Sequence, residues 1–182
     1  MELEQENEVI KSVLQGKREA YAVLVDAYRT QIFNLAYRMT GNYEDASDLA
    51  QETFIRAYRN LRQFDPGKRF FTWLYTIGLN LIRNHLKKRG REISRENATQ
   101  ISSEAGTDQG TQAEQDLIQA QEIHHLEICL QKLPTDLREA IVLRFYQDLS
   151  FEEIAVISDA SLSAVKMRVY RGLEQLKRLV EK

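Results

Sequence analysis

The sequence predicts an all-α protein made of two small helical domains joined by a flexible acidic linker. Apolar residues recur at intervals of three and four along most of the chain, and only two prolines interrupt them. No stretch alternates between polar and apolar residues as a half-buried strand does. The predicted limits are 1–92 for the first domain, 93–115 for the linker and 116–182 for the second domain.

Two amphipathic segments open the first domain. An apolar stripe along 8–14 and 19–39 comprises Val9, Val13, Ala20, Val23, Leu24, Ala27, Ile32, Leu35, Ala36 and Met39. Gly41 then ends the pattern, as a glycine just beyond a helix does. A second helix is expected over 44–61, with its stripe formed by Ala46, Leu49, Ala50, Phe54, Ala57, Tyr58 and Leu61.

A third helix, from about Phe70 to Lys88, follows the turn sequence Asp65-Pro66-Gly67, because proline presets φ and glycine tolerates turn geometry. Residues 68–90, KRFFTWLYTIGLNLIRNHLKKRG, combine the only tryptophan with a dense group of lysines and arginines. Most of the apolar side chains in this helix are expected in the core, namely Phe70, Phe71, Trp73, Leu74, Ile77 and Leu81.

Charge divides the chain into blocks. Residues 62–95 carry a net charge of +7, residues 96–127 carry −7, and residues 163–182 carry +4. The acidic block overlaps a polar segment with few large apolar side chains, which cannot bury enough surface to offset the entropy of ordering it. Two separated basic blocks indicate two sites for anionic partners. Because these blocks and the linker carry opposite charges, both an extended chain and a compact one that masks its own basic faces remain open.

The second domain contains a predicted helix-turn-helix. Helical periodicity returns from about residue 113 and continues, after Pro134, through three more helices. Ser150 and Glu153 have the spacing of a capping box, and Ser161 is a candidate cap for the last helix. Between them, Asp159 is suited to the left-handed turn conformation.

The last helix is predicted to bury one stripe, formed by Val165, Val169, Leu173 and Leu176. Its opposite face is polar and basic, with Ser163, Lys166, Met167, Tyr170 and Arg171, and with Arg168 beside them. This polarity suits a helix that enters the major groove of DNA. A plain antiparallel helix pair with solvated lysines and arginines remains the alternative.

Composition limits other classes of function. Cys129 is the only cysteine, which excludes an internal disulfide and fits a reducing compartment. One cysteine and three histidines give no metal-ligand spacing, so neither a metal nor another cofactor is expected. No apolar run reaches the roughly 20 residues that a membrane span needs. The acidic N-terminus does not resemble a signal peptide, and the expected location is the cytoplasm.

Four segments, in order, resemble the extracytoplasmic-function (ECF, group IV) sigma factors of the sigma-70 family. They are DASDLAQETFIRAYRNL (45–61), FDPGKRFFTWLYTIGLNLIRNHLKKR (64–89), LPTDLREAIVLRFYQDLSFEEIA (133–155) and AVKMRVYRGLEQL (164–176). The resemblance implies that 1–92 is sigma region 2 and that 116–182 is region 4. It also implies a non-enzymatic subunit that directs core RNA polymerase to promoters and is held inactive by an anti-sigma factor.

The resemblance assigns roles to individual residues. The loop from Arg62 to Arg69 would receive a flipped base of the −10 element, and Asn80 and Asn84 would contact base edges. Arg83, Lys87 and Lys88 would neutralise phosphates there, and the same DNA-binding set includes Arg62, Lys68 and Arg69 of the loop. Ser163, Lys166, Met167, Arg168, Tyr170 and Arg171 would contact the −35 element. The residues assigned to the clamp helices of the β′ subunit are Asp45, Asp48, Gln51, Glu52 and Arg56, while the second domain would bind the β flap.

Two other classes of function remain open from sequence alone. A stand-alone helix-turn-helix repressor or activator would bind duplex DNA without polymerase. A DNA-processing enzyme would need a site built from scattered carboxylates and from His85, His124 and His125. Adjacent histidines on a helix point in different directions, which disfavours the second alternative.

Overall fold

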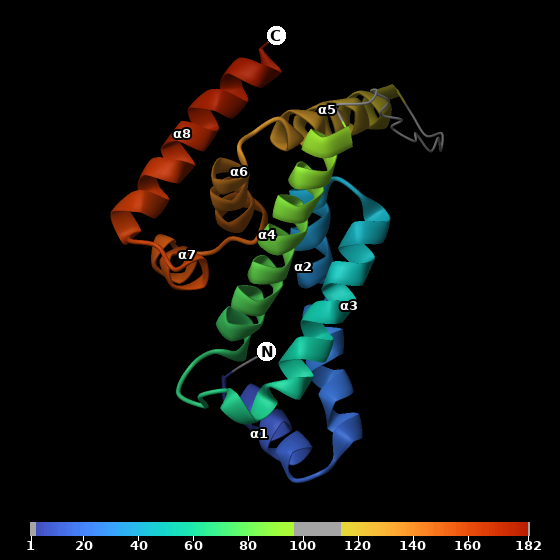
Figure 1. Ribbon diagram of the computed structural model, residues 1–182, viewed down its shortest axis with the longest axis vertical. Helices are drawn as coiled ribbons and strands as arrows, with labels where there is room; N and C mark the ends of the chain where they lie inside the picture. Colours follow the sequence, from blue (N-terminus) through green and yellow to red (C-terminus); the bar gives the residue numbers. More distant parts are fainter. Residues whose placement is uncertain (1–2, 97–113, 182) are drawn as a thin grey trace.

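The computed structural model describes residues 3–96 and 114–181, and these residues form helices without a single strand among them (Figure 1). The predicted all-α fold class is therefore confirmed. Most of the predicted linker lies outside the described residues. The N-terminal helices are α1 (Leu3–Leu14), η1 (Arg18–Ala20), α2 (Tyr21–Thr40), α3 (Tyr43–Arg59), η2 (Leu61–Gln63) and α4 (Phe70–Glu96). The C-terminal helices are α5 (Glu114–Gln131), α6 (Thr135–Ile141), the π-helical turn η3 (Val142–Tyr146), α7 (Phe151–Ser158) and α8 (Leu162–Val180).

The ends of α2 and α3 follow from local sequence. Gly41 ends α2 in the left-handed conformation, with φ 68°, and its N–H donates to the Tyr37 carbonyl at 2.8 Å. The Asn42 side chain then caps α3 by accepting from the Asp45 N–H at 2.9 Å. Two residues of the predicted stripes are not in the core, since Val23 is 49% exposed and Tyr58 is 37% exposed.

Helix α4 is longer than predicted, because it continues past Lys88 to Glu96. Gly78 lies in its middle, where glycine costs a helix about 1 kcal/mol relative to alanine. Its position allows a close approach to α3. A β-carbon at residue 78 would lie only 3.3 Å from Thr53 Cγ2. The glycine therefore lets α4 pack tightly against α3.

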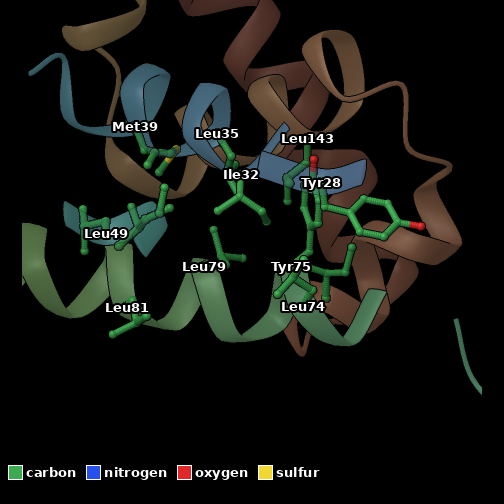
Figure 2. Packing of buried hydrophobic residues seen from close by; sticks show 14 of the residues in the cluster. Tyr28, Ile32, Leu35, Met39, Leu49, Leu74, Tyr75, Leu79, Leu81 and Leu143 are labelled. Carbon is green, nitrogen blue, oxygen red and sulfur yellow. The ribbon is translucent and has the colours of Figure 1, made fainter. Parts of the chain in front are cut away.

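The core of the N-terminal helices extends into the C-terminal helices. Figure 2 shows Ile32 and Leu35 of α2 facing Leu79 of α4, with Leu143 of η3 among the same group of side chains. Leu143 is fully buried, as are these three residues. The two halves of the chain thus share one hydrophobic core, and the arrangement is the compact one.

Polar contacts join the two halves along a surface that we call the domain seam. It is formed by Arg38, Met39, Arg69, Tyr75 and Arg83 on one side, and by Gln131, Arg138, Glu139, Tyr146, Gln147, Glu153 and Ser158 on the other. At one end of the seam, the Gln131 side chain donates to the Arg38 carbonyl at 2.7 Å. The Arg138 guanidinium donates to the Met39 carbonyl at 2.5 Å. Two carbonyls left over at the end of α2 are therefore satisfied by residues of the other half.

At the centre of the seam, Arg83 of α4 forms a bidentate ion pair with Glu139 of α6. Its Nε and Nη2 atoms lie 2.8 and 2.6 Å from the two carboxylate oxygens. Glu139 also accepts from the Ser158 hydroxyl at 2.8 Å, and its side chain is only 5% exposed. Nearby, the Tyr75 hydroxyl donates to the Gln147 side chain at 2.6 Å. These contacts fix the orientation of the C-terminal helices on α4.

Candidate nucleic-acid interface

Helices α7 and α8 form the predicted helix-turn-helix. Ser150 and Glu153 make a capping box, in which each side chain accepts from the backbone N–H of the other residue. Asp159 ends α7 in the left-handed conformation, with φ 51° and ψ 52°. Ser161 then caps α8 by accepting from the Ala164 N–H at 3.2 Å. The three predictions made for this motif are confirmed.

The predicted buried stripe of α8 is wrong at one position. Leu173 is 40% exposed, and Gly172 occupies the buried position next to Val165 and Val169. A β-carbon at Gly172 would lie 2.8 Å from Ile141 Cγ1. Helix α6 therefore approaches α8 so closely that only glycine fits, and Leu173 is rotated outward.

The outward face of α8 is the one that sequence predicts for DNA. Ser163, Lys166, Met167, Tyr170 and Arg171 are exposed, while Arg168 is half-buried beside them. The Lys166 ammonium lies 5.8 Å from the centre of the Phe151 ring, which directs it along the first helix of the motif. Hydroxyl, ammonium, guanidinium and apolar groups on one face can contact both base edges and phosphates.

A second polar face lies on α4. Asn80, Asn84, Lys87 and Lys88 are all exposed, so four of the residues assigned to the −10 element share an accessible surface. Arg83, the other α4 residue assigned to the −10 element, is not accessible in the same way. Arg83 is turned toward Glu139 and is half-buried in the domain seam. In the compact arrangement its guanidinium therefore neutralises a carboxylate of the chain itself.

The loop between η2 and α4 lies at the start of this face. Asp65 and Lys68 close a turn, with the Lys68 N–H donating to the Asp65 carbonyl at 3.0 Å. Arg62 and Lys68 are exposed, while Arg69 is 3.4 Å from Glu153 across the seam. Below the loop, the rings of Phe64, Phe70 and Trp73 pack with centroids 5.4 to 5.7 Å apart.

The aromatic residues of α4 are mainly in the core, as predicted. Phe70 and Leu74 are fully buried, whereas Phe71, Trp73 and Ile77 are partly buried at its edge. Tyr75 was missed by the sequence analysis and is fully buried. Burial raises the pKa of its hydroxyl well above the ordinary value, so the group remains a hydrogen-bond donor.

The residues predicted to contact polymerase lie on α3, and they differ in how far the chain itself engages them. Asp45 is held within the chain, because its carboxylate lies 2.8 Å from Arg89 and 3.3 Å from His85. Asp48 and Gln51 are exposed. Glu52 and Arg56 pair with each other at 2.7 Å.

Gln51 also lines a groove of about 690 Å³ between α2 and α3. The groove is lined by Val25, Arg29, Thr30, Phe33, Tyr43, Ser47, Ala50, Gln51, Phe54 and Ile55. Its apolar part was not predicted from sequence, where only the charged side of α3 indicated a contact surface. Tyr43, 69% exposed, and Ile55, 38% exposed, are the residues that could have indicated it.

The histidines do not form a site. His85 Nε2 lies 3.3 Å from an Asp45 carboxylate oxygen, and His125 lies 3.6 Å from the buried Cys129 thiol. Among the residues whose side chains are described, no three His, Cys, Asp or Glu side chains gather where they could hold a metal ion. None of the described helices is both long and apolar enough to cross a membrane.

Fold and surfaces together define a helical DNA-binding protein with a helix-turn-helix. Comparison with known families makes this specific: the models of "Sigma-70 region 2" and "Sigma-70, region 4" match residues 24–92 and 126–176. The chain belongs to the sigma-70 family of RNA polymerase sigma factors, among its ECF members. It is thus a polymerase subunit that directs the core enzyme to promoters at the start of transcription.

Two characterised relatives cover nearly the whole chain. It is 35% identical over 175 residues to the ECF RNA polymerase sigma factor SigW of Bacillus subtilis, covering 93% of both chains. It is 31% identical to the RNA polymerase sigma-H factor of Pseudomonas aeruginosa, covering 98% of this chain and 95% of that one.

Two solved structures have the same fold. The sigma factor RpoE, in complex with the anti-sigma factor NepR from Bartonella quintana, matches with a TM-score of 0.71 and 25% identity over 88% of this chain and 96% of that one. CnrH, in complex with the cytosolic domain of CnrY, matches with a TM-score of 0.70 and 25% identity over 96% of both chains.

Proposed function

We propose that the two exposed polar faces contact two promoter elements, the face of α4 at −10 and the face of α8 at −35. The observation that carries this assignment is their chemistry, because Asn80 and Asn84 stand beside Lys87 and Lys88, as Tyr170 stands beside Lys166 and Arg171. The chain acts by binding rather than by catalysis, and it works in the cytoplasm with the polymerase.

In the first of these contacts, the loop from Arg62 to Arg69 receives an unstacked base while α4 lies along the duplex edge. A flipped base needs a surface that replaces its lost stacking and cations that follow the strand. In the loop, Arg62 and Lys68 are exposed, and the ring of Phe64 packs 5.4 Å from that of Trp73 at the start of α4. Arg83 joins this surface only after it leaves Glu139, so promoter binding by Arg83 requires the domain seam to open.

In the second contact, α8 enters the major groove through its N-terminal half. Ser161 caps the helix, and Ser163, Lys166 and Met167 lie in its first two turns. Hydrogen-bonding groups at this end can reach base edges, while Arg171 reaches the phosphates. The predicted linker tethers the two halves, so that binding of one element raises the local concentration of the other half near its own.

The α3 surface is the proposed docking site for polymerase. Gln51 lines the groove between α2 and α3, and Glu52 is the next residue of α3; apolar residues of the groove such as Ile55 can pack against the β′ clamp helices. Charged residues around such a groove set register and association rate. The helices of region 4 contact the β flap.

An anti-sigma factor is the proposed regulator. Two proteins of the same fold are described in complex with an anti-sigma factor or with a cytosolic domain of a second protein. The groove between α2 and α3, with Tyr43 and Ile55 exposed, is a surface that such a partner can cover. Coverage there excludes the polymerase.

Binding to core RNA polymerase is the test of the docking surface. We expect Gln51→Ala/Glu52→Ala to weaken binding at least tenfold relative to wild type. The matched control is Gln5→Ala/Glu8→Ala, which removes the same two side-chain types from exposed positions on α1. Equal affinity for both double variants would discard the α3 surface, and absence of wild-type binding would overturn the proposal as a whole.

Binding of the holoenzyme to −35 DNA tests the proposed role of α8. Lys166→Ala/Arg171→Ala is expected to lower the affinity of the holoenzyme for −35 DNA, with a smaller salt dependence. Lys177→Ala/Arg178→Ala is the control, because it removes the same charges from exposed positions at the far end of the same helix. Equal losses in both variants would mean that α8 contributes general charge rather than specific contacts.

A further inference from the structure

Helix α1 carries a buried acid in an otherwise ordinary amphipathic pattern. It packs Ile10 and Val13 into the core, while Glu6 is 1% exposed. The helix precedes the residues matched to sigma region 2, and it lies at the end of the bundle where α3 ends and α4 begins (Figure 1). A carboxylate in such a place needs hydrogen bonds to offset the loss of water.

The partners of Glu6 are at the start of α4. One carboxylate oxygen accepts from the backbone N–H of Phe70, the first residue of that helix, at 3.1 Å. The other accepts from the Tyr28 hydroxyl. An anion at a helix N-terminus satisfies a free N–H and is favoured by the helix dipole. Glu6 therefore caps α4 from a separate helix, 64 residues away in sequence.

The Tyr28 ring extends this contact to the aromatic residues next to the loop. Its centroid lies 6.0 Å from that of Phe70 and 5.9 Å from that of Phe71. Burial, and then the hydrogen bond to Glu6, raise the pKa of the Tyr28 hydroxyl well above its ordinary value. The hydroxyl thus stays protonated and remains a hydrogen-bond donor to Glu6.

The next residue of α1 contacts the loop itself. Asn7 Nδ2 donates to the Pro66 carbonyl at 3.1 Å, at the corner of the turn between Asp65 and Lys68. The loop is consequently held at two points from α1, once at its corner and once where α4 begins. Both contacts are polar and directional, and a leucine at either position could fill space without fixing the backbone.

We propose that Glu6 and Asn7 are positioning residues that hold the loop 62–69 in the shape that accepts a flipped −10 base. This inference rests on the proposed function, because it gives that loop its purpose. A pocket formed in advance captures an unstacked base without first having to order its own backbone. Helix α1 supplies that order while touching no DNA.

The experiment compares Asn7→Asp, Asn7→Ala and Glu6→Gln with Glu8→Ala, an exposed acid on the same helix. Aspartate has the shape of asparagine but presents an oxygen to the Pro66 carbonyl, so it replaces attraction by repulsion. The probe is a single-stranded DNA selected from a random pool by the wild-type holoenzyme, with 2-aminopurine at each position in turn. Its fluorescence reports base flipping, and its anisotropy reports affinity.

We expect Asn7→Ala to weaken binding of this strand about three- to tenfold, which corresponds to the loss of one hydrogen bond. Asn7→Asp is expected to weaken it further and to reduce the fluorescence at the flipped position. Glu8→Ala should match wild type. Affinity for core polymerase and the unfolding temperature should stay unchanged for the Asn7 variants. Trypsin should cleave Asn7→Asp severalfold faster after Lys68, with cleavage after Arg29 unaltered.

Three outcomes would overturn the inference. Unchanged strand binding and unchanged cleavage in all variants would mean that α1 does not position the loop, while the proposed function would stand. Parallel losses of strand binding, polymerase binding and unfolding temperature would reduce Glu6 and Asn7 to general structural residues. A wild-type holoenzyme that selects no strand from the pool would overturn the proposed function, and the inference with it.

Discussion

Two interfaces of this molecule bury helices in different ways. Inside the N-terminal half, α2 meets α4 through fully buried apolar side chains such as Ile32, Leu35 and Leu79. At the domain seam, apolar contacts are joined by the guanidinium groups of Arg83 and Arg138, which bond to a carboxylate and to backbone carbonyls. Water can replace those hydrogen bonds when the seam opens, whereas exposed leucines have no such compensation.

This difference in chemistry indicates which of the two interfaces stays closed. An apolar interface is stable in many side-chain arrangements, and it resists separation in water. A seam rich in hydrogen bonds specifies one orientation, as interfaces between domains that separate often do. The N-terminal half is therefore suited to remain one rigid unit, while the polar contacts that hold the C-terminal helices, including the pair between Arg83 and Glu139, can be replaced by water.

The largest expected effect is at the apolar interface. Leu79→Ala removes a fully buried side chain and should lower the free energy of unfolding by about 3 kcal/mol, with little dependence on salt. Denaturant titration measures this loss. Val23→Ala, at a position 49% exposed, is the control and should cost well under 1 kcal/mol. Similar losses for the two variants would contradict the division into core and surface.

Breaking the ion pair of the seam comes next. Glu139→Ala removes the carboxylate that accepts from Arg83 and from the Ser158 hydroxyl. It should cost about 2 kcal/mol, below the usual range for buried pairs because Arg83 is 31% exposed, can regain water and keeps the Ser158 carbonyl as an acceptor. X-ray scattering should show a larger radius of gyration. Glu152→Ala, an exposed acid on α7, should change neither quantity.

The same pair offers a sharper test. Arg83→Met/Glu139→Leu replaces both charges by apolar side chains, which often preserves or raises stability at buried pairs. The double variant should therefore recover most of the loss and close the seam again. A double variant as unstable as Glu139→Ala would show that the charges themselves are needed.

A smaller effect is expected where α2 ends against the seam. Gly41→Ala forces a β-carbon into a backbone with φ 68° and within 3.0 Å of the Gln131 side chain, which should cost about 1–2 kcal/mol. Gly90→Ala has the opposite expected sign. The position is exposed on α4, where alanine favours a helix by about 0.5–1 kcal/mol relative to glycine. Thermal unfolding of both variants measures the contrast.

The smallest effect concerns a neutral bond of the seam. Tyr75→Phe removes the hydroxyl that donates to Gln147 and should cost about 1 kcal/mol, independent of salt. A double-mutant cycle with Gln147→Ala isolates the pairwise energy. A coupling energy near zero would mean that the hydroxyl and the amide are each equally well satisfied by water.

Features decided within a few residues were predictable from sequence. The capping box of Ser150 and Glu153, the left-handed Asp159 and the cap at Ser161 depend on neighbours within three positions, and all three are present. The end of α2 at Gly41 is of the same kind. Local rules therefore placed the helices and the helix-turn-helix.

Features that depend on distant residues escaped prediction. Arg83 and Glu139 are 56 residues apart, and nothing near either one indicates the other. Gly172 replaces Leu173 in the buried stripe because α6 approaches α8 there, which periodicity alone does not contain. The apolar groove beside Gln51 likewise arises only when α2 and α3 are assembled. The roles of the assigned DNA and polymerase residues stay predictions.

The cap that Arg138 places on α2 also sets an order of events during synthesis. The Met39 carbonyl and its guanidinium partner are separated by 99 residues. At about 5–20 residues per second, a ribosome needs roughly 5–20 s to add them. During that interval the Met39 carbonyl lacks its guanidinium partner and can bond only to water. The nascent chain therefore completes an early helix only after much of its C-terminal half has been translated.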